Sequence, residues 1–253
     1  MQKRRIDRKE YISFLSKQNS CLLGPQGIGK TTLLKQLKGV YIDCSRLSIS
    51  PENFAVEYVG SITHAAEKAP AKDYERYLDI DFLLKHVSGK GTKALLLAIE
   101  NELLKIKPNQ RLLIASAFAF PESLSKEKGK LHIKLDNFEE LLALNNYSQI
   151  DDLISLFLEE IKKHTTRYSL ASSSTFLLKK HLKMQMKELL PFTEKETDEL
   201  AKAYGINDKK LHQLTEGIPF LVEEVCKRYQ ETKNLEKAFI KELLDRKSAS
   251  YNL

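Results

Sequence analysis

The sequence is poor in the residues that build several large classes of protein. It has 3 cysteines, 10 glycines and 7 prolines among 253 residues. So few glycines and prolines argue against a turn-rich all-β fold. The cysteines Cys21, Cys44 and Cys226 are odd in number and stand in apolar stretches. We therefore expect reduced core residues, not a disulfide framework or a zinc site. Neither a CxxC nor an HExxH motif occurs.

Long apolar runs are also missing. No stretch approaches the ~20 residues that a membrane-spanning helix needs. The N-terminus is basic but lacks the apolar segment of a signal peptide. We therefore expect a cytoplasmic protein that does not associate with membranes. Apolar residues nevertheless make up 42% of the chain, which is enough for a buried core.

The charge is moderately basic, with a formal net charge of +7. Such a chain can bind nucleic acid, but an excess of lysine is often only a solvated surface. The densest basic patch is the Lys-Arg-Arg run at residues 3–5, followed by Arg8 and Lys9. It indicates either contact with DNA or a solubilising tail, so DNA remains an open partner.

The first fifty residues predict the start of a parallel α/β sheet. A short apolar run at 20–23 stops at Gly24, as a buried strand does. Helical spacing follows over 31–37, and 40–44 favours a second strand. This order of strand, loop, helix and strand is typical of α/β domains with helices on both faces of the sheet.

The middle of the chain alternates long helices with short strands. Most of 51–127 has helical patterning and forms a helical insertion. Within it, 110–120 is so apolar that helix and strand both fit, and we favour helix. The remaining elements that we expect are strands at 131–136, 168–172 and 184–190 and a helix at 150–164.

The pattern changes after Pro191. Thr193 and Glu196 form the signature of a capping box, and only helical segments follow. We therefore expect an α/β core over 1–190 and a small all-helical domain over 191–253.

A glycine-rich loop follows the first strand. Its residues match the pattern G-x-x-x-x-G-K-[ST] and are Gly24, Pro25, Gln26, Gly27, Ile28, Gly29, Lys30 and Thr31. In such a loop, consecutive backbone N–H groups point at phosphate oxygens. Lys30 reaches the β- and γ-phosphates, the Thr31 hydroxyl ligates magnesium, and Thr32 can steady the phosphate next to the sugar. An accidental glycine-rich turn is the alternative, but the strand before the loop and the helix after it favour binding of ATP with Mg²⁺.

A P-loop needs a carboxylate at the end of a neighbouring strand to hold the magnesium. Asp136 supplies one, and Asp43 at the end of the second strand is its rival. Many ATPases place a water-polarising Glu directly after this Asp, whereas this chain has Asn137. Asn can orient a water molecule but cannot take its proton at neutral pH. Glu139 and Glu140 are substitutes for that role, or simply the solvated start of a helix.

Together these residues resemble the archaeal-type ATPases of the STAND group, relatives of the AAA-type ATPases and of the origin-recognition proteins. The P-loop and the segment Leu-Asp-Asn-Phe-Glu-Glu-Leu at 135–141 carry the resemblance. The segment 6–10 is similar to a short family box near the adenine, which implies a role for Arg8. The segment 170–174 resembles a strand that ends in a polar sensor, which implies Ser172.

The helical end of the chain also resembles that family. The segment 215–221 contains a Gly217-x-Pro219 turn like the one in the family's helical lid, which implies that this turn contacts the nucleotide. The family often carries a C-terminal winged helix that binds DNA or a protein. Here the chain ends at Leu253, so either the winged helix is absent or the sequence is a fragment.

The resemblance implies an ATP-driven switch that works with a protein partner or as an oligomer. Two departures favour an alternative, a scaffold that holds ATP or ADP and hydrolyses little. Asn137 replaces the usual Glu, and no arginine lies between Arg167 and Arg228 to act as a finger or sensor. A small-molecule kinase is a third interpretation, which the long insertion at 51–127 leaves open.

Overall fold

The computed structural model describes residues 6–250, without the side chains of 175, 177 and 247–250. The basic run at 3–5 lies outside the described residues. The chain forms two compact units. We call residues 12–23 and 31–187 the sheet unit. The helical unit contains the described residues up to Tyr11, the loop Gly24–Lys30 and the chain from Glu188 onward.

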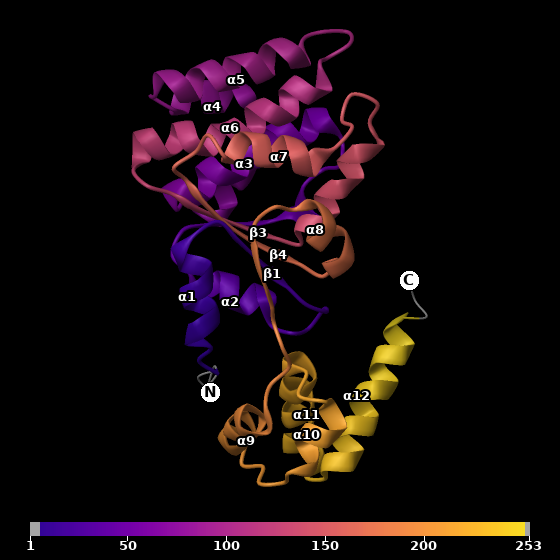
Figure 1. Cartoon of the computed structure of the whole chain (residues 1–253). Coiled ribbons are helices and arrows are strands. Elements are labelled where there is room, and N and C mark those ends of the chain that lie inside the picture. The colour runs from indigo at the N-terminus through magenta and orange to yellow at the C-terminus, as the bar shows by residue number, and fades with distance from the viewer. Residues whose placement is uncertain (1–5, 251–253) are drawn as a thin grey trace. The chain divides into compact units, whose positions relative to one another are not determined.

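A five-stranded parallel sheet organises the sheet unit (Figure 1). Its strands are β1 (Ser20–Leu23), β2 (Val40–Asp43), β3 (His132–Asp136), β4 (Arg167–Ser172) and β5 (Gln185–Glu188). The spatial order is β2-β3-β4-β1-β5. Leu23 is paired with Ser172, and Asp43 with Asp136, so the carboxyl ends of these strands share one edge of the sheet. The expected α/β fold with a parallel sheet is confirmed.

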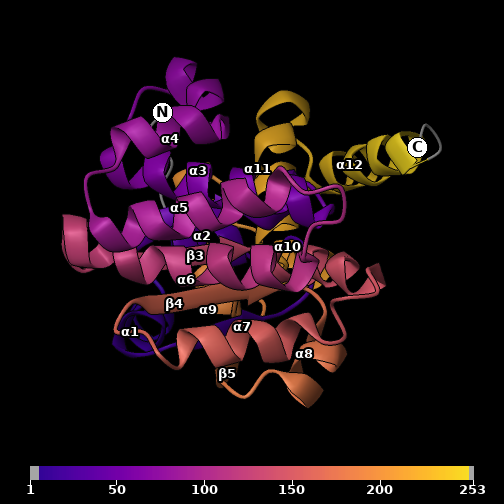
Figure 2. The ribbon, with the colours of Figure 1, turned by 90° about the horizontal axis from the view of Figure 1, so that it is seen from above.

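Helices cover the strands. They are α1 (Lys9–Lys17), α2 (Lys30–Gln36), α3 (Pro51–Glu67), α4 (Ile80–His86), α5 (Lys90–Leu103), α6 (Gln110–Lys128), α7 (Leu153–Ile161) and α8 (Thr175–His181), with 3₁₀ turns at Cys44–Arg46, Ala71–Leu78 and Phe138–Asn146. In Figure 1, α3 to α7 lie above the strands. The packing of α6 against both α3 and α5 can be followed in Figure 2. The aromatic rings of Phe54, Phe118 and Phe157 are fully buried in this core.

The segment 51–127 is mostly helical, as its patterning predicts. The Ser50 hydroxyl accepts a 3.3 Å hydrogen bond from the backbone N–H of Asn53, and Pro51 is the first residue of α3. The segment 110–120 is helical, as we favoured, and α6 continues through Pro121 to Lys128.

The helical unit contains α9 (Glu194–Ala203), α10 (Lys210–Thr215), α11 (Pro219–Thr232) and α12 (Leu235–Ser250). A separate apolar cluster around Val222, Val225 and Cys226 holds these helices together. The capping box of Thr193 and Glu196 is present at α9, as expected. Among the described residues, no helix combines the length and the apolar character needed to cross a membrane.

The division into compact units differs from the boundary that we expected near Pro191. It falls after Lys187, and it groups the segment before Ile12 and the loop Gly24–Lys30 with the C-terminal helices. The reason is tertiary, because Arg8 and Gly27 both form hydrogen bonds with residues beyond Lys187.

Candidate functional site

The glycine-rich loop leaves β1 after Leu23 and enters α2 at Lys30. Gly27 has a φ of 81° and Gly29 a φ of 99°, a backbone region that side chains with a Cβ rarely adopt. Ile28 between them is 1% exposed and anchors the loop. The sequence therefore places glycine where the loop needs left-handed geometry, as a phosphate-binding loop requires.

The amine of Lys30 lies within the curve of this loop. Its Nζ donates hydrogen bonds of 2.6 Å to the carbonyl of Gly24 and 3.0 Å to the carbonyl of Pro25. The residue is only 7% exposed. A buried ammonium bonded to neutral carbonyls is a strong attractor for an anion, since phosphate oxygens are better acceptors for a charged donor.

The remaining loop positions face outward. Pro25 and Gln26 are exposed, Thr31 is half-buried and Thr32 is exposed on the first turn of α2. The predicted nucleotide contacts of these residues stay predictions.

The Gly217-x-Pro219 turn leads directly into α11, whose first residue is Pro219. The next residue, Phe220, donates a 3.1 Å backbone hydrogen bond to the carbonyl of Gly27 in the loop. The carbonyl of Gly217 accepts a 2.7 Å hydrogen bond from the N–H of Phe192. The turn thus connects the glycine-rich loop with the helices, and the Gly217 carbonyl already has a protein partner.

Arg8 is almost fully buried, at 8% exposure. Its guanidinium donates to both carboxylate oxygens of Glu196, at 3.0 and 3.2 Å, and to the carbonyls of Leu190 and Pro191, at 2.7 and 3.0 Å. It also stacks over the ring of Phe192, 4.7 Å from the centroid. These contacts make Arg8 a structural clamp of the helical unit, and its expected place near the adenine stays a prediction.

At the carboxyl edge of the sheet, Asp136 is 1% exposed. Its Oδ2 accepts a 2.8 Å hydrogen bond from the Tyr41 hydroxyl, and its Oδ1 a 3.2 Å bond from the N–H of Asn137. Sequence reasoning missed Tyr41. The sequence places Tyr41 two residues before Asp43 on an expected strand. It does not show that this strand pairs with β3, and that pairing brings Tyr41 to Asp136.

Asn137 has a left-handed backbone with φ 52° and ψ 44°. Its side-chain Nδ2 donates a 2.8 Å hydrogen bond to Oδ1 of Asp43. Asp43 also accepts from the N–H and hydroxyl of Ser45, at 3.2 and 2.7 Å. Burial alone raises the pKa of Asp43, but these bonds outweigh it and hold the pKa below its usual range. Asp43, the rival for the magnesium role, is therefore occupied by protein donors.

Glu139 points toward the end of β4. Its Oε1 accepts hydrogen bonds from both the N–H of Ser173, at 2.8 Å, and the Ser173 hydroxyl. Its Oε2 is buried and has no hydrogen-bond partner among the described residues. Burial raises the pKa of Glu139, but the hydroxyl of Ser173, then the hydroxyl of Ser172 and the N–H of Ser173, more than compensate and leave the pKa lowered. Glu139 is thus an ionised carboxylate with one free acceptor atom, whereas Glu140 is exposed as a solvated helix start would be.

The candidate sensor Ser172 is fully buried at the last position of β4, where its hydroxyl accepts a 3.0 Å bond from the N–H of Ser174.

Few protein ligands are available for a magnesium ion. In the part of the chain that the structure describes, no group of three or more His, Cys, Asp or Glu side chains could hold a metal ion. One carboxylate from Asp136 and one hydroxyl from Thr31 nevertheless fit magnesium, which is usually bound by one or two protein ligands together with phosphates and water.

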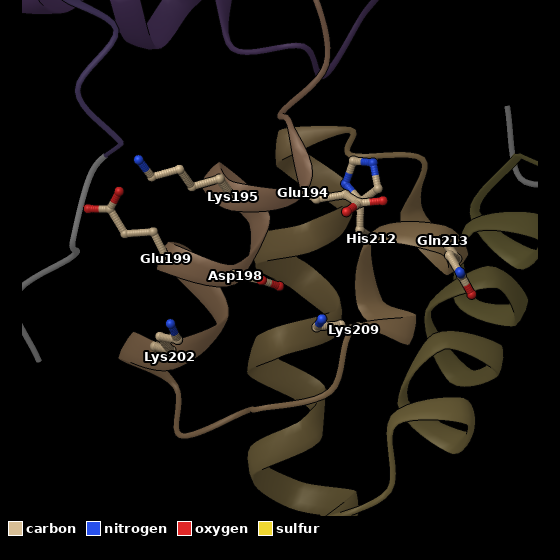
Figure 3. A pocket seen from close by; sticks show the side chains of 8 residues that line it. All are labelled: Glu194, Lys195, Asp198, Glu199, Lys202, Lys209, His212 and Gln213. Carbon is tan, nitrogen blue, oxygen red and sulfur yellow. The ribbon is translucent and has the colours of Figure 1, made fainter.

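The helical unit has a surface pocket of about 570 Å³, lined by residues of α9 and α10 (Figure 3). Its rim carries both signs of charge, including Asp198, Lys202 and Lys209. None of the residues that we singled out from the sequence lines it.

No family model matches the chain, and no curated protein matches its sequence. Among solved structures, the Walker-type ATPase of Pyrococcus abyssi is similar, with a TM-score of 0.68 and 18% identity. The match covers 97% of this chain and 73% of that protein. The chain therefore has an α/β P-loop fold with a helical C-terminal region.

Proposed function

We propose that this chain binds ATP with Mg²⁺ through its glycine-rich loop. The observation that carries the proposal is the loop itself, with glycines at positive φ and the Lys30 ammonium buried within its curve. The backbone N–H groups of Gly27 and Gly29 cradle phosphate oxygens, and Lys30 exchanges its carbonyl partners for them. ADP binds the same loop.

In this proposal the metal is held by Thr31 and Asp136, and Thr32 steadies the phosphate next to the sugar. Magnesium supplies charge neutralisation at the phosphates when it is bound. The chain's own contribution is positional, since Tyr41 and the backbone of Asn137 fix the two oxygens of Asp136. Further proposed nucleotide contacts are Ser172 within the sheet unit and Arg8, Gly217 and Pro219 within the helical unit.

Glu139 is the proposed proton acceptor for hydrolysis. Its lowered pKa keeps it ionised at neutral pH, and its free Oε2 can accept a proton from an attacking water molecule. Asn137 cannot take that role, because its side-chain amide is a donor tied to Asp43. Hydrolysis is therefore slower than in an ATPase with Glu at this position.

We further propose that the chain acts as a nucleotide-dependent switch in a DNA-associated or multiprotein assembly, as the resemblance to the STAND group implies. The hydrogen bond from Phe220 to Gly27 supports this role, since it links the loop to the first turn of α11. A loop that changes shape around phosphates pulls on this bond.

The second candidate is a scaffold that holds nucleotide and hydrolyses almost none. The engagement of Asn137 with Asp43 favours it, as does the lack of arginine between Arg167 and Arg228.

One set of measurements tests these proposals. The nucleotide carried through purification is identified by chromatography, and ATP affinity is measured for the wild type and Lys30→Ala. We expect Lys30→Ala to lose at least tenfold in affinity, and equal affinity contradicts the binding proposal.

ATP turnover is then compared for the wild type, Glu139→Gln and the matched control Glu140→Gln. A selective loss in Glu139→Gln supports slow hydrolysis through Glu139, whereas turnover at the buffer rate in all three supports the scaffold.

A further inference from the structure

Each strand of the sheet is entered past a positively charged side chain. In the spatial order of the strands, these are Lys38 before β2, Lys130 before β3, Arg167 at the first position of β4, Lys17 before β1 and Lys183 before β5. No acidic residue lies between any of these cations and its strand. We call this set of five side chains the strand-start row.

The fold brings the row together. All five strands are parallel, so the segments that enter them lie at the amino edge of the sheet. Neighbouring strands are about 4.8 Å apart, so five entry points span roughly 19 Å. The order of these residues along the chain does not predict that they lie together. Lys17 and Lys183, for example, are far apart in the sequence but precede adjacent strands.

The row is free to interact. All five side chains are exposed. Among the described residues, Lys17, Lys38, Lys130 and Lys183 form no ion pair, and the guanidinium of Arg167 donates a hydrogen bond only to the carbonyl of Ser16. Long cationic side chains without a carboxylate partner create a positive potential along this edge.

His132, the first residue of β3, reports the same environment. Burial, and then the positive charges of Arg167 and Lys134, lower its pKa to about 4. The carboxylates of Asp43 and Asp136 lie at the other ends of their strands. Two carboxylates do lie near the entry of β4, and each has a cation of its own: Glu122 pairs with Lys126 and accepts hydrogen bonds from Thr165 and Thr166, and Glu160 pairs with Lys163.

We propose that the strand-start row binds the phosphate backbone of duplex nucleic acid. A duplex carries one negative charge per about 1.7 Å of its axis, so a line of cations about 19 Å long matches it over several phosphates. Every member of the row is a phosphate-type donor, and none of the large exposed apolar side chains lies in a strand-entry segment. A protein partner would need apolar or aromatic anchors there. Backbone contacts do not read bases, so binding is independent of sequence.

The experiment measures binding of the full chain to a fluorescent duplex DNA by anisotropy over a series of salt concentrations, without ATP. The row variant is Lys38→Gln, Lys130→Gln and Lys183→Gln together. The control is Lys72→Gln, Lys85→Gln and Lys93→Gln, three exposed lysines of the helical insertion. Both variants change the net charge equally, and circular dichroism confirms that both are folded.

We expect the row variant to bind at least tenfold more weakly at low salt and its salt slope to fall by about 2.7, at 0.9 for each lost phosphate contact. We expect the control variant to keep an affinity within twofold of the wild type and a similar salt slope. Equal weakening of both variants, or no salt-dependent binding by the wild type, overturns the proposal. Tighter binding to polyglutamate than to DNA overturns it in favour of an acidic protein. An RNA duplex that binds like the DNA supports it, since the backbone chemistry is shared.

Discussion

The hydroxyl of Tyr41 donates a 2.8 Å hydrogen bond to Oδ2 of Asp136 across the β2–β3 pair. The carboxylate of Asp136 is buried, so it has few other donors to hold its orientation. Burial of the Tyr41 ring, and then its bond to Asp136, raise the pKa of Tyr41 above its usual range. The hydroxyl therefore remains protonated and remains a donor at physiological pH.

Tyr41→Phe removes this donor while it preserves the ring. We expect the magnesium concentration needed for half-maximal ATP binding to rise about tenfold, because a hydrogen bond to a charged group contributes about 1.5 kcal/mol. ATP binding in EDTA should not change. Titration of Mg²⁺ at fixed ATP measures the effect. Tyr74→Phe, which removes a hydroxyl bonded to Ser61, is the control. An unchanged magnesium dependence in Tyr41→Phe would show that Asp136 needs no such positioning.

Arg8→Ala should destabilise the helical unit. The change removes a buried cation that bonds Glu196 and the carbonyls of Leu190 and Pro191, so we expect a loss of about 3 kcal/mol. Urea unfolding measures it, and faster hydrogen exchange in α9 locates it. The control Arg111→Ala breaks an exposed pair with Glu159 at 3.6 Å and should cost under about 1 kcal/mol. Equal losses in the two variants would contradict a clamp at Arg8.

Gly39→Ala should be among the most damaging small substitutions. Gly39 has a φ of 128°, and an added Cβ would lie 2.3 Å from the carbonyl oxygen of His132. Gly129→Ala is a matched control, since Gly129 has a φ of 93° but no heavy atom within 4 Å of the added Cβ. We expect about 1 kcal/mol for Gly129→Ala from backbone strain alone and at least about 3 kcal/mol for Gly39→Ala. Thermal or urea unfolding of both variants decides, and similar losses would contradict the close approach at His132.

His132 makes stability depend on pH. Its pKa is lowered from 6.5 to about 4, chiefly by burial. Between these two values the unfolded chain binds more protons than the folded one, so stability falls as pH drops from 6.5 toward 4. The residue is only partly buried, so we expect this share to be about 1–2 kcal/mol. His132→Gln should flatten the difference in unfolding free energy between pH 7 and pH 5. The same difference in the variant and the wild type would contradict it.

Local patterns in the sequence determined most of the elements. The spacing of apolar residues predicts β1 and α2, the pair Thr193 and Glu196 predicts the start of α9, and the glycine-rich loop predicts its own left-handed turns at Gly27 and Gly29. These features depend on neighbours within a few residues along the chain, so they can be read without the fold.

Only the tertiary structure decided which side chains meet. Tyr41 and Asp136 lie 95 positions apart in the chain, and Arg8 and Glu196 lie 188 apart. The engagement of Glu139 with Ser173 likewise depends on the pairing of β3 with β4. The strand-start row exists because parallel strands put all their entry points at one edge. Strand order and register set such contacts, and each strand's own sequence is compatible with several neighbours. The sequence alone therefore specifies a phosphate-binding loop. The packed sheet sets the surroundings of Asp136 and Glu139 and brings the cations of the strand-start row to one edge.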